Sequence, residues 1–209
     1  MIKYKTIMKE GEIQQVIERS KFIACVRPVE SRDEADAFIA ERRTLFKDAT
    51  HNVPAFVIGE KNRLQWASDD GEPQGTSGAP IVQMMEAEGL TNLVAVVTRY
   101  FGGTKLGTGG LVRAYTGAAR EAIYKAGLYY AREDVLLGFS MDYTFLGKLQ
   151  NMSLGGLFRI MDTEYSDKVL VTLAAESSHE EDVVGLVKNL TSGSEIQNFR
   201  RLEVVKVPI

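Results

Sequence analysis

The sequence predicts an α+β protein made of two domains. Apolar residues follow strand spacing in some segments of the 209-residue chain and helix spacing in others. The pattern changes near Leu128–Asp134, and we place the domain boundary there, giving domains 1–130 and 131–209. After this boundary the segments run strand, helix, strand, strand, helix, strand, which is a known α+β motif.

The first domain is expected to form around a nearly continuous apolar strand, Leu93–Thr98, that is buried on both faces. Ser31 has the position of a helix N-cap, and Glu34 completes a capping box. Gly89 and Gly127 stand where two helices should stop. The expected elements are strands at 12–18, 20–29, 52–58, 64–68 and 93–98, and helices at 31–46, 79–88 and 111–126.

The second domain is expected to form a ferredoxin-like βαββαβ unit. Turn residues separate its segments at Gly155-Gly156, Ser166-Asp167 and Ser192-Gly193. Its expected elements in chain order are strand 135–143, helix 145–153, strands 157–165 and 168–176, helix 180–190 and strand 195–205.

The composition is that of an ordinary globular chain, with 44% hydrophobic and 25% charged residues. A net charge of −3 does not favour a protein that binds a polyanion by bulk charge. No apolar stretch has the length of a signal-peptide core or a membrane span, so we expect a cytoplasmic protein outside the membrane. The single cysteine, Cys25, lies in an apolar run, which favours a buried structural thiol. Spacing alone assembles no catalytic set around His51 or Cys25.

Three carboxylates lie close together in one loop, at Asp69, Asp70 and Glu72. Such a group can bind a divalent metal ion through oxygen ligands or act as an acid–base pair. The pattern is also typical of a turn in which Asp side chains bond backbone amides, or of an ion pair. The next segment, Gly75–Pro80, precedes a helix and can either receive an anion or supply Ser77 as the N-cap.

A second loop follows the central strand and combines glycine with positive charge. Free amides at the start of the next helix, with cations close by, favour a phosphate site. The spacings of a P-loop and of a dinucleotide fingerprint are both absent. Tyr100 and Phe101 are candidates for stacking on bases, and one of them is expected to pack in the core. The predicted nucleic-acid or phosphate-binding residues are Arg99, Gly102, Gly103, Lys105, Gly107, Gly109, Gly110 and Arg113.

The two loops resemble the signature of the IMPACT (YigZ) family. The resemblance rests on Asp69-Asp70-Gly71-Glu72-Pro73-x-Gly75-Thr76-x-Gly78-x-Pro80 and on the run RYFGGTKLGTGGLVRAY from Arg99 to Tyr115. Two shorter blocks also match, Ser20-Lys21-Phe22-Ile23 and, less completely, Asp48-Ala49-Thr50-His51. The likeness covers the whole chain, which is identified as a bacterial two-domain member.

The resemblance implies an N-terminal domain of the ribosomal-protein, elongation-factor domain IV type. It implies a C-terminal ferredoxin-like domain similar to the last domain of elongation factor G. Eukaryotic relatives act in translation control, where they compete for an activator of the kinase that phosphorylates an initiation factor. The chain is expected to lack the extra N-terminal domain that those relatives use for protein contacts. The expected partners are therefore RNA or the ribosome, with translation-control proteins as further candidates, and neither a catalytic residue nor a cofactor is implied.

The main functional hypothesis is a non-enzymatic, translation-associated regulatory protein whose Arg99, Lys105 and Arg113 contact RNA phosphates. The rival is a metal-dependent enzyme, in which the three carboxylates hold a divalent ion and the glycine loop holds a phosphorylated or carboxylated substrate. A third hypothesis is a protein-interaction module, in which the acidic and basic loops pair with each other and fix the shape of a groove.

Overall fold

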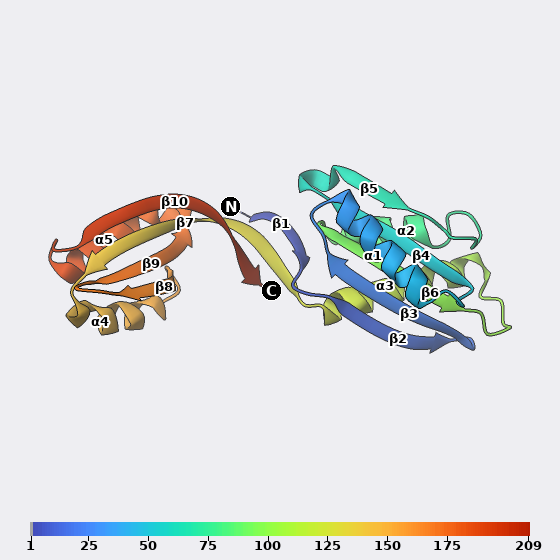
Figure 1. Ribbon diagram of the computed structural model, residues 1–209. Coiled ribbons are helices and arrows are strands. Elements are labelled where there is room, and N and C mark those ends of the chain that lie inside the picture. Colours follow the sequence, from blue (N-terminus) through green and yellow to red (C-terminus); the bar gives the residue numbers. More distant parts are fainter. Residues whose placement is uncertain (1) are drawn as a thin grey trace. The chain divides into compact units, whose positions relative to one another are not determined.

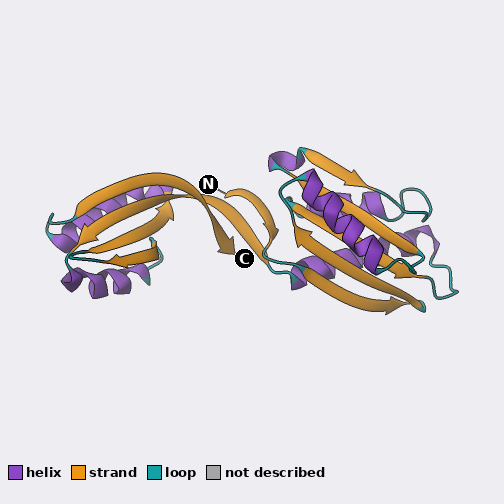
Figure 2. Ribbon diagram, viewed as in Figure 1, coloured by secondary structure: helices purple, strands orange, loops and turns teal. Residues whose placement is uncertain are grey.

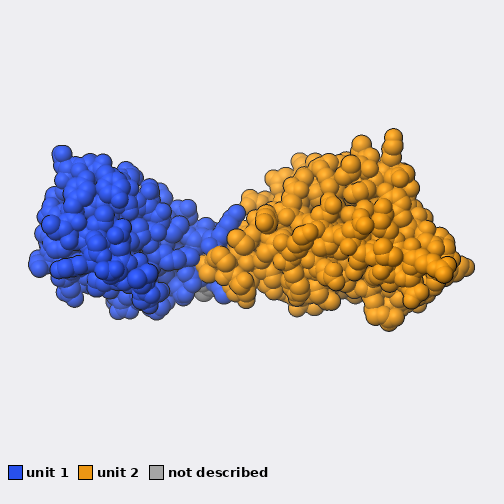
Figure 3. Space-filling view, turned by 90° about the horizontal axis from the view of Figure 1, so that it is seen from below, with its two compact units in different colours: residues 1–3, 131–206 blue, residues 4–130, 207–209 orange. Residues whose placement is uncertain are grey.

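The computed structural model describes residues 2–209, except the side chain of Lys61. The chain forms two compact units (Figure 3). The N-terminal unit comprises residues 4–130 and 207–209, and the C-terminal unit comprises residues 131–206 together with residues 2 and 3. Compared with the predicted ranges 1–130 and 131–209, a few residues at each terminus group with the other unit.

From β2 onward, strands and helices follow one another in the predicted order. The elements of the first part of the chain are β1 (Ile2–Ile7), β2 (Gly11–Ile17), β3 (Ser20–Pro28), α1 (Arg32–Leu45), β4 (His51–Ile58), the 3-10 turn η1 (Glu60–Asn62), β5 (Leu64–Ala67), α2 (Gly78–Ala87), β6 (Leu93–Tyr100) and α3 (Gly107–Lys125). They continue with β7 (Leu128–Met141), α4 (Tyr143–Ser153), β8 (Arg159–Tyr165), β9 (Val169–Glu176), the 3-10 turn η2 (Ser177–His179), α5 (Glu180–Thr191) and β10 (Ile196–Pro208).

The sheet of the N-terminal unit has the strand order β2-β3-β6-β4-β5, and every pair in it is antiparallel. Helix α1 crosses one face of this sheet, while α2 and α3 lie on the other (Figures 1 and 2). The central strand β6 is buried along nearly its whole length, because helices cover both of its faces. The prediction of a strand buried on both faces is confirmed.

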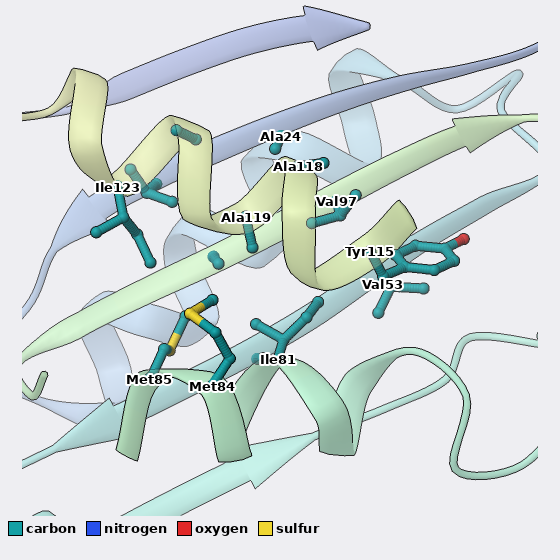
Figure 4. Packing of buried hydrophobic residues seen from close by; sticks show 14 of the residues in the cluster. Ala24, Val53, Ile81, Met84, Met85, Val97, Tyr115, Ala118, Ala119 and Ile123 are labelled. Atoms are coloured by element: carbon teal, nitrogen blue, oxygen red, sulfur yellow. The ribbon is translucent and has the colours of Figure 1, made fainter. Parts of the chain in front are cut away.

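Two clusters of buried side chains, one on each face, hold the N-terminal unit together. On the α2–α3 face, Ile81 and Met85 point toward Ala119 and Ile123 (Figure 4). Small alanines along α3 let this helix approach the sheet closely. The cluster on the α1 face includes Cys25, so the predicted burial of this thiol is confirmed, and burial raises its pKa to about 12.

The C-terminal unit has the element order β-α-β-β-α-β that the sequence predicted. In its sheet the order is β1-β7-β9-β8, and β10 also pairs with β7. Alternate residues of β7, from Val135 to Met141, pack with α4 and α5 around Leu149 and Val187. Together the two sheets confirm the α+β class.

Two features of the strands were not predicted. The first strand, β1, lies at Ile2–Ile7, where no strand is predicted from the sequence. Strand β7 begins at Leu128, within the segment predicted to be the domain boundary. Within residues 2–209, no helix is both long enough and apolar enough to span a membrane.

Candidate functional site

A cluster of polar side chains lies at one end of the N-terminal sheet, where β3 and β4 begin and the neighbouring strand β6 ends. The register pairs Arg99 of β6 with Phe22 of β3 on one side and with His51 of β4 on the other. Because side chains alternate along a strand, Arg99 continues the row that includes Val97 and faces α3. A charged residue therefore occupies the last position of a row that is otherwise core.

Glu72, from the loop between β5 and α2, supplies the opposite charge. Its Oε1 accepts hydrogen bonds from Arg99 Nη1 and from the Tyr115 hydroxyl, each at 2.7 Å. Oε1 also lies 3.7 Å from His51 Nε2. Burial, followed by the bond to Glu72, raises the pKa of Tyr115 far above its usual range, so the phenol stays a donor. The buried carboxylate is thus compensated by a cation and a neutral donor.

Arg99 is held in place by aromatic rings as well as by Glu72. Its Nη2 donates to Ser20 Oγ at 3.2 Å. The guanidinium carbon lies 5.5 Å from the ring centroid of Phe22 and 5.4 Å from that of Phe101. Arg99 Nε is buried and has no hydrogen-bond partner within the described part of the chain. Arg99 has 4% of its surface exposed, so its guanidinium is directed at partners within the chain rather than at solvent.

The other two predicted cations are both exposed and lie close together. Lys105 and Arg113 line one surface pocket of about 450 Å³ with Glu18 and Leu106. Arg113 Nη1 lies 3.7 Å from the point where a Cβ on Gly109 would stand, which places the guanidinium beside the first turn of α3. The structure therefore brings Lys105 and Arg113 together at this turn.

The loop glycines have different structural roles. A Cβ on Gly102 would lie 1.9 Å from the carbonyl oxygen of Arg19, so only glycine fits against that backbone. Gly103 and Gly107 have φ angles of 87° and 69°, which glycine adopts without strain. Gly109 and Gly110 belong to the first turn of α3, where Gly110 lies against Leu106.

The first turn of α3 has no side-chain cap among the described residues. The amide N–H groups of Gly107, Thr108 and Gly109 come before the first residues that can donate along the helix. They add partial positive charge next to Lys105 and Arg113. The sequence-based prediction of a phosphate site at this turn stays a prediction.

The start of α2 is different, because Asp69 already occupies it. The Asp69 carboxylate accepts hydrogen bonds from the amides of Gly75, Ser77 and Gly78 and from the Ser77 hydroxyl, at 2.7 to 3.1 Å. Partial burial by itself would raise the pKa of Asp69, but these hydrogen bonds lower it below its usual range. Asp69 is therefore the anion at this helix, and Ser77 makes no side-chain cap of its own.

Asp70 orients the strand that carries His51. Its Oδ2 accepts from the amide of Asn52 at 2.7 Å, and its Oδ1 accepts from Arg43 at 3.0 Å. Its backbone carbonyl lies 2.8 Å from His51 Nδ1, which fixes the direction of the imidazole ring.

The three carboxylates of the acidic loop thus bind three different sets of partners within the chain. In the part of the chain that the structure describes, no group of three His, Cys, Asp or Glu side chains could hold a metal ion. The third hypothesis requires the acidic and basic loops to pair with each other. The ion pair that the structure shows joins Glu72 of the acidic loop to Arg99, which lies near the end of β6, just before the basic loop.

A second pocket, of about 470 Å³, lies over this cluster. His51, Glu72 and Arg99 contribute polar groups to its lining, while Phe101 and Leu111 contribute apolar surface. Sequence reasoning missed His51 and Tyr115 as members of the site. Both stand inside regular elements, and the strand register that brings His51 beside Arg99 cannot be deduced from local sequence.

The fold and the site define an α+β protein of two sheet-and-helix units, with the polar cluster confined to the N-terminal unit. The chain belongs to the IMPACT family. A family model described as the Impact N-terminal domain matches residues 18–123, which include the whole cluster. A second model, described as a domain of unknown function (DUF1949), matches residues 139–194. The resemblance found in the sequence is confirmed.

Similar proteins extend over most of the chain. The IMPACT family member YvyE of Bacillus subtilis is 38% identical over 91% of this chain and 88% of its own length. The IMPACT family member YigZ of Escherichia coli is 30% identical, covering 87% of this chain and 90% of that protein. A crystal structure described as that of a hypothetical protein superposes with a TM-score of 0.58 at 26% identity, covering 98% of both chains. That structure shares the fold described above.

Proposed function

We propose that the protein is a translation-associated regulator that contacts RNA or the ribosome through the first turn of α3. The observation that carries the proposal is an uncapped helix start flanked by two exposed cations, Lys105 and Arg113. Amides at a helix N-terminus bind phosphate, and neighbouring cations strengthen that binding. Membership of the IMPACT family, whose eukaryotic members act in translation control, supports the biological setting.

The proposed contact is local rather than spread over the protein surface. A net charge of −3 gives little long-range attraction to RNA, so phosphates must be bound one by one at this turn. Arg99 has a supporting role in this proposal, because its hydrogen bonds to Glu72 and Ser20 fix the strand end from which the glycine loop begins. Lys105 and Arg113 remain the direct contacts from the predicted set.

The likeness to translation factors at the level of domains belongs to the same proposal. The βαββαβ order of the C-terminal unit supports a ferredoxin-like domain resembling the last domain of elongation factor G. We further propose that the N-terminal unit, with its five-stranded sheet and helices, resembles domain IV of elongation factors. Function is nevertheless argued from the α3 turn, since a shared fold does not imply a shared role.

Binding of the full-length chain to a labelled single-stranded oligoribonucleotide and to purified ribosomes tests the proposal. The double variant Lys105→Ala, Arg113→Ala should bind more weakly and show a smaller salt dependence, by roughly 0.7 in slope per lost phosphate contact. The matched control Lys148→Ala, Arg201→Ala removes two exposed cations from the C-terminal unit and should bind like wild type. Equal affinities and slopes for wild type and the Lys105, Arg113 variant would exclude the α3 turn as the contact.

A further inference from the structure

The pocket of about 470 Å³ over the Glu72–Arg99 pair is not explained by a phosphate contact on the surface. Its volume is that of a small-molecule site, since such pockets typically hold about 300–1,000 Å³. Every residue that lines it belongs to the N-terminal unit, so the pocket is complete within one compact body. Phosphate alone would fill a small part of this volume.

One end of the pocket favours negative charge. Lys105, Gly107 and Thr108 all line it, so the uncapped start of α3 opens into the same space. Arg99 lines it as well, with its side chain 5% exposed. Within the described residues, the buried Nε of Arg99 has no acceptor, and a buried donor without a partner is costly in a folded protein. Because Arg99 belongs to the lining, this unsatisfied donor is a second observation, separate from the helix start, that favours a ligand with acceptor oxygens.

The remaining lining favours a flat apolar body. Pro73, Leu106 and Leu111 line the pocket together with Phe101. Phe101 is 47% exposed, although the Arg99 guanidinium lies 5.4 Å from its ring centroid. An exposed aromatic ring in a cationic pocket is the usual platform on which a nucleic-acid base stacks.

Groups in the lining can also bond the edge of a base. The bond between His51 Nδ1 and the Asp70 carbonyl directs Nε2 of the neutral ring to act as an acceptor. The nearby Oε1 of Glu72 already accepts from Arg99 and Tyr115, so His51 Nε2 is the acceptor that remains for a ligand. An acceptor in the lining favours a base that carries an exocyclic amino group.

We propose that this pocket binds a single nucleotide unit, with its base stacked on Phe101 and its phosphate at the start of α3. The inference rests on the proposed RNA contact and assigns it a substrate class, namely one unstacked nucleotide with an amino-bearing base. It extends the contact from the charged surface of α3 into a pocket that can tell a nucleotide from a bare phosphate.

Calorimetric titration of the full-length protein with adenosine 5′-monophosphate, adenosine and inorganic phosphate tests the proposal. The monophosphate should bind saturably, and the nucleoside and the phosphate should each bind at least about tenfold more weakly, since each lacks one half of the recognition. Comparable binding of inorganic phosphate and the monophosphate would overturn the base-stacking part and with it the proposal. The absence of saturable binding by the monophosphate would overturn it outright.

Two pairs of variants locate the ligand. Phe101→Leu keeps an apolar side chain but removes the stacking face, so affinity for the monophosphate should fall about tenfold. Tyr165→Leu, an exposed aromatic of the C-terminal unit, should leave that affinity unchanged. Thr108→Pro removes one amide donor from a turn where Pro is tolerated, whereas Thr108→Ala retains the amide, so only the proline variant should lose affinity. Wild-type affinity in both Phe101→Leu and Thr108→Pro would place the nucleotide elsewhere.

The RNA measurement separates this inference from the proposed function. If RNA binding depends on Lys105 and Arg113 while Phe101→Leu binds RNA and nucleotide normally, the surface contact stands and the nucleotide pocket is wrong. If the monophosphate binds as expected while RNA binding ignores both cations, the pocket stands and the RNA contact is wrong. Circular dichroism and thermal melting identify any variant that fails to fold. If Phe101→Leu or Thr108→Pro does not fold, the other of these two variants tests the pocket.

Discussion

A single oxygen of Glu72 joins three elements of the N-terminal unit, because it accepts from Arg99 of β6 and Tyr115 of α3. Taking both charges out of water costs about as much as their attraction returns, so the pair adds little net stability compared with apolar side chains. It instead selects one arrangement of the loop, the strand and the helix. The arrangement of the acidic loop, β6 and α3 at this end of the sheet therefore depends on an ion pair as well as on apolar packing.

Glu72→Gln should expose this dependence. The amide has nearly the same shape, but Arg99 is left buried without a counter-charge, which costs about 3–5 kcal/mol. Urea unfolding, with hydrogen exchange to report on β3, β4 and β6, would measure the loss. Arg99→Met combined with Glu72→Gln should recover part of it, because the unpaired cation is gone. Equal stabilities of wild type and Glu72→Gln would show that the pair is not needed.

Glycine is required at some loop positions and not at others, and this difference can be measured. Gly102→Ala would place Cβ 1.9 Å from the Arg19 carbonyl oxygen, so the β2–β3 turn or the loop must move. We expect a loss of at least about 2 kcal/mol, a typical cost for overpacking a tight site. Gly109→Ala meets a nearest side-chain atom at 3.7 Å and should stabilise α3 by about 0.5–1 kcal/mol. Chemical denaturation of the two variants would show opposite signs, and a harmless Gly102→Ala would contradict the packing account.

Helices α2 and α3 differ in whether their N-terminal amides are capped by a side chain. Asp69 binds those of α2, while no described side chain caps those of α3. A capping side chain typically stabilises a helix by about 1 kcal/mol. Helix α3 lacks this contribution at the turn where the proposed ligand would bind. Because Asp69 already binds the N-terminal amides of α2, the segment Gly75–Pro80 does not form a second site for an external anion.

The Asp69 cap should give the stability of the protein a measurable pH dependence. Because the folded-state pKa is depressed, the carboxylate stabilises the fold above its unfolded pKa of about 3.9, and this contribution is lost as the pH falls through the lower folded value. Asp69→Asn keeps one acceptor oxygen but does not titrate. The stability difference between wild type and Asp69→Asn, measured by urea unfolding, should therefore shrink as the pH is lowered below about 4. A constant difference across this range would mean that the cap is not charged in the folded state.

Local patterns in the sequence predicted most elements but not their pairing. Helix α1 was placed by Ser31 and Glu34, and Ser31 Oγ does accept from the Glu34 amide, at 3.3 Å. Strand β1 is not predicted from the sequence; in the structure its six residues pass from exposed to buried along the strand instead of alternating. Local sequence favours Arg99 as a phosphate contact, because nothing local shows that Glu72, 27 residues earlier, folds back to pair with it. Contacts across the sheet are set by register, which a single sequence does not reveal.

At the scale of the whole molecule, each unit has its own hydrophobic core. The described residues form two clusters on the N-terminal sheet and a separate cluster in the C-terminal unit. The candidate site draws all its residues from the N-terminal unit. Stability of the site should therefore follow the core of that unit.

Matched cavity variants test this expectation. Leu173→Ala in the C-terminal core and Ile81→Ala in the N-terminal core both truncate fully buried side chains, and each should cost about 2–5 kcal/mol within its own unit. Hydrogen exchange should show lost protection in β9 for Leu173→Ala and in β4 and β6 for Ile81→Ala. RNA binding at moderate temperature should persist in Leu173→Ala and weaken in Ile81→Ala. If Leu173→Ala removed protection from β6 as strongly as from β9, the two cores would unfold as one cooperative unit, and the site would depend on the whole chain rather than on the unit that contains it.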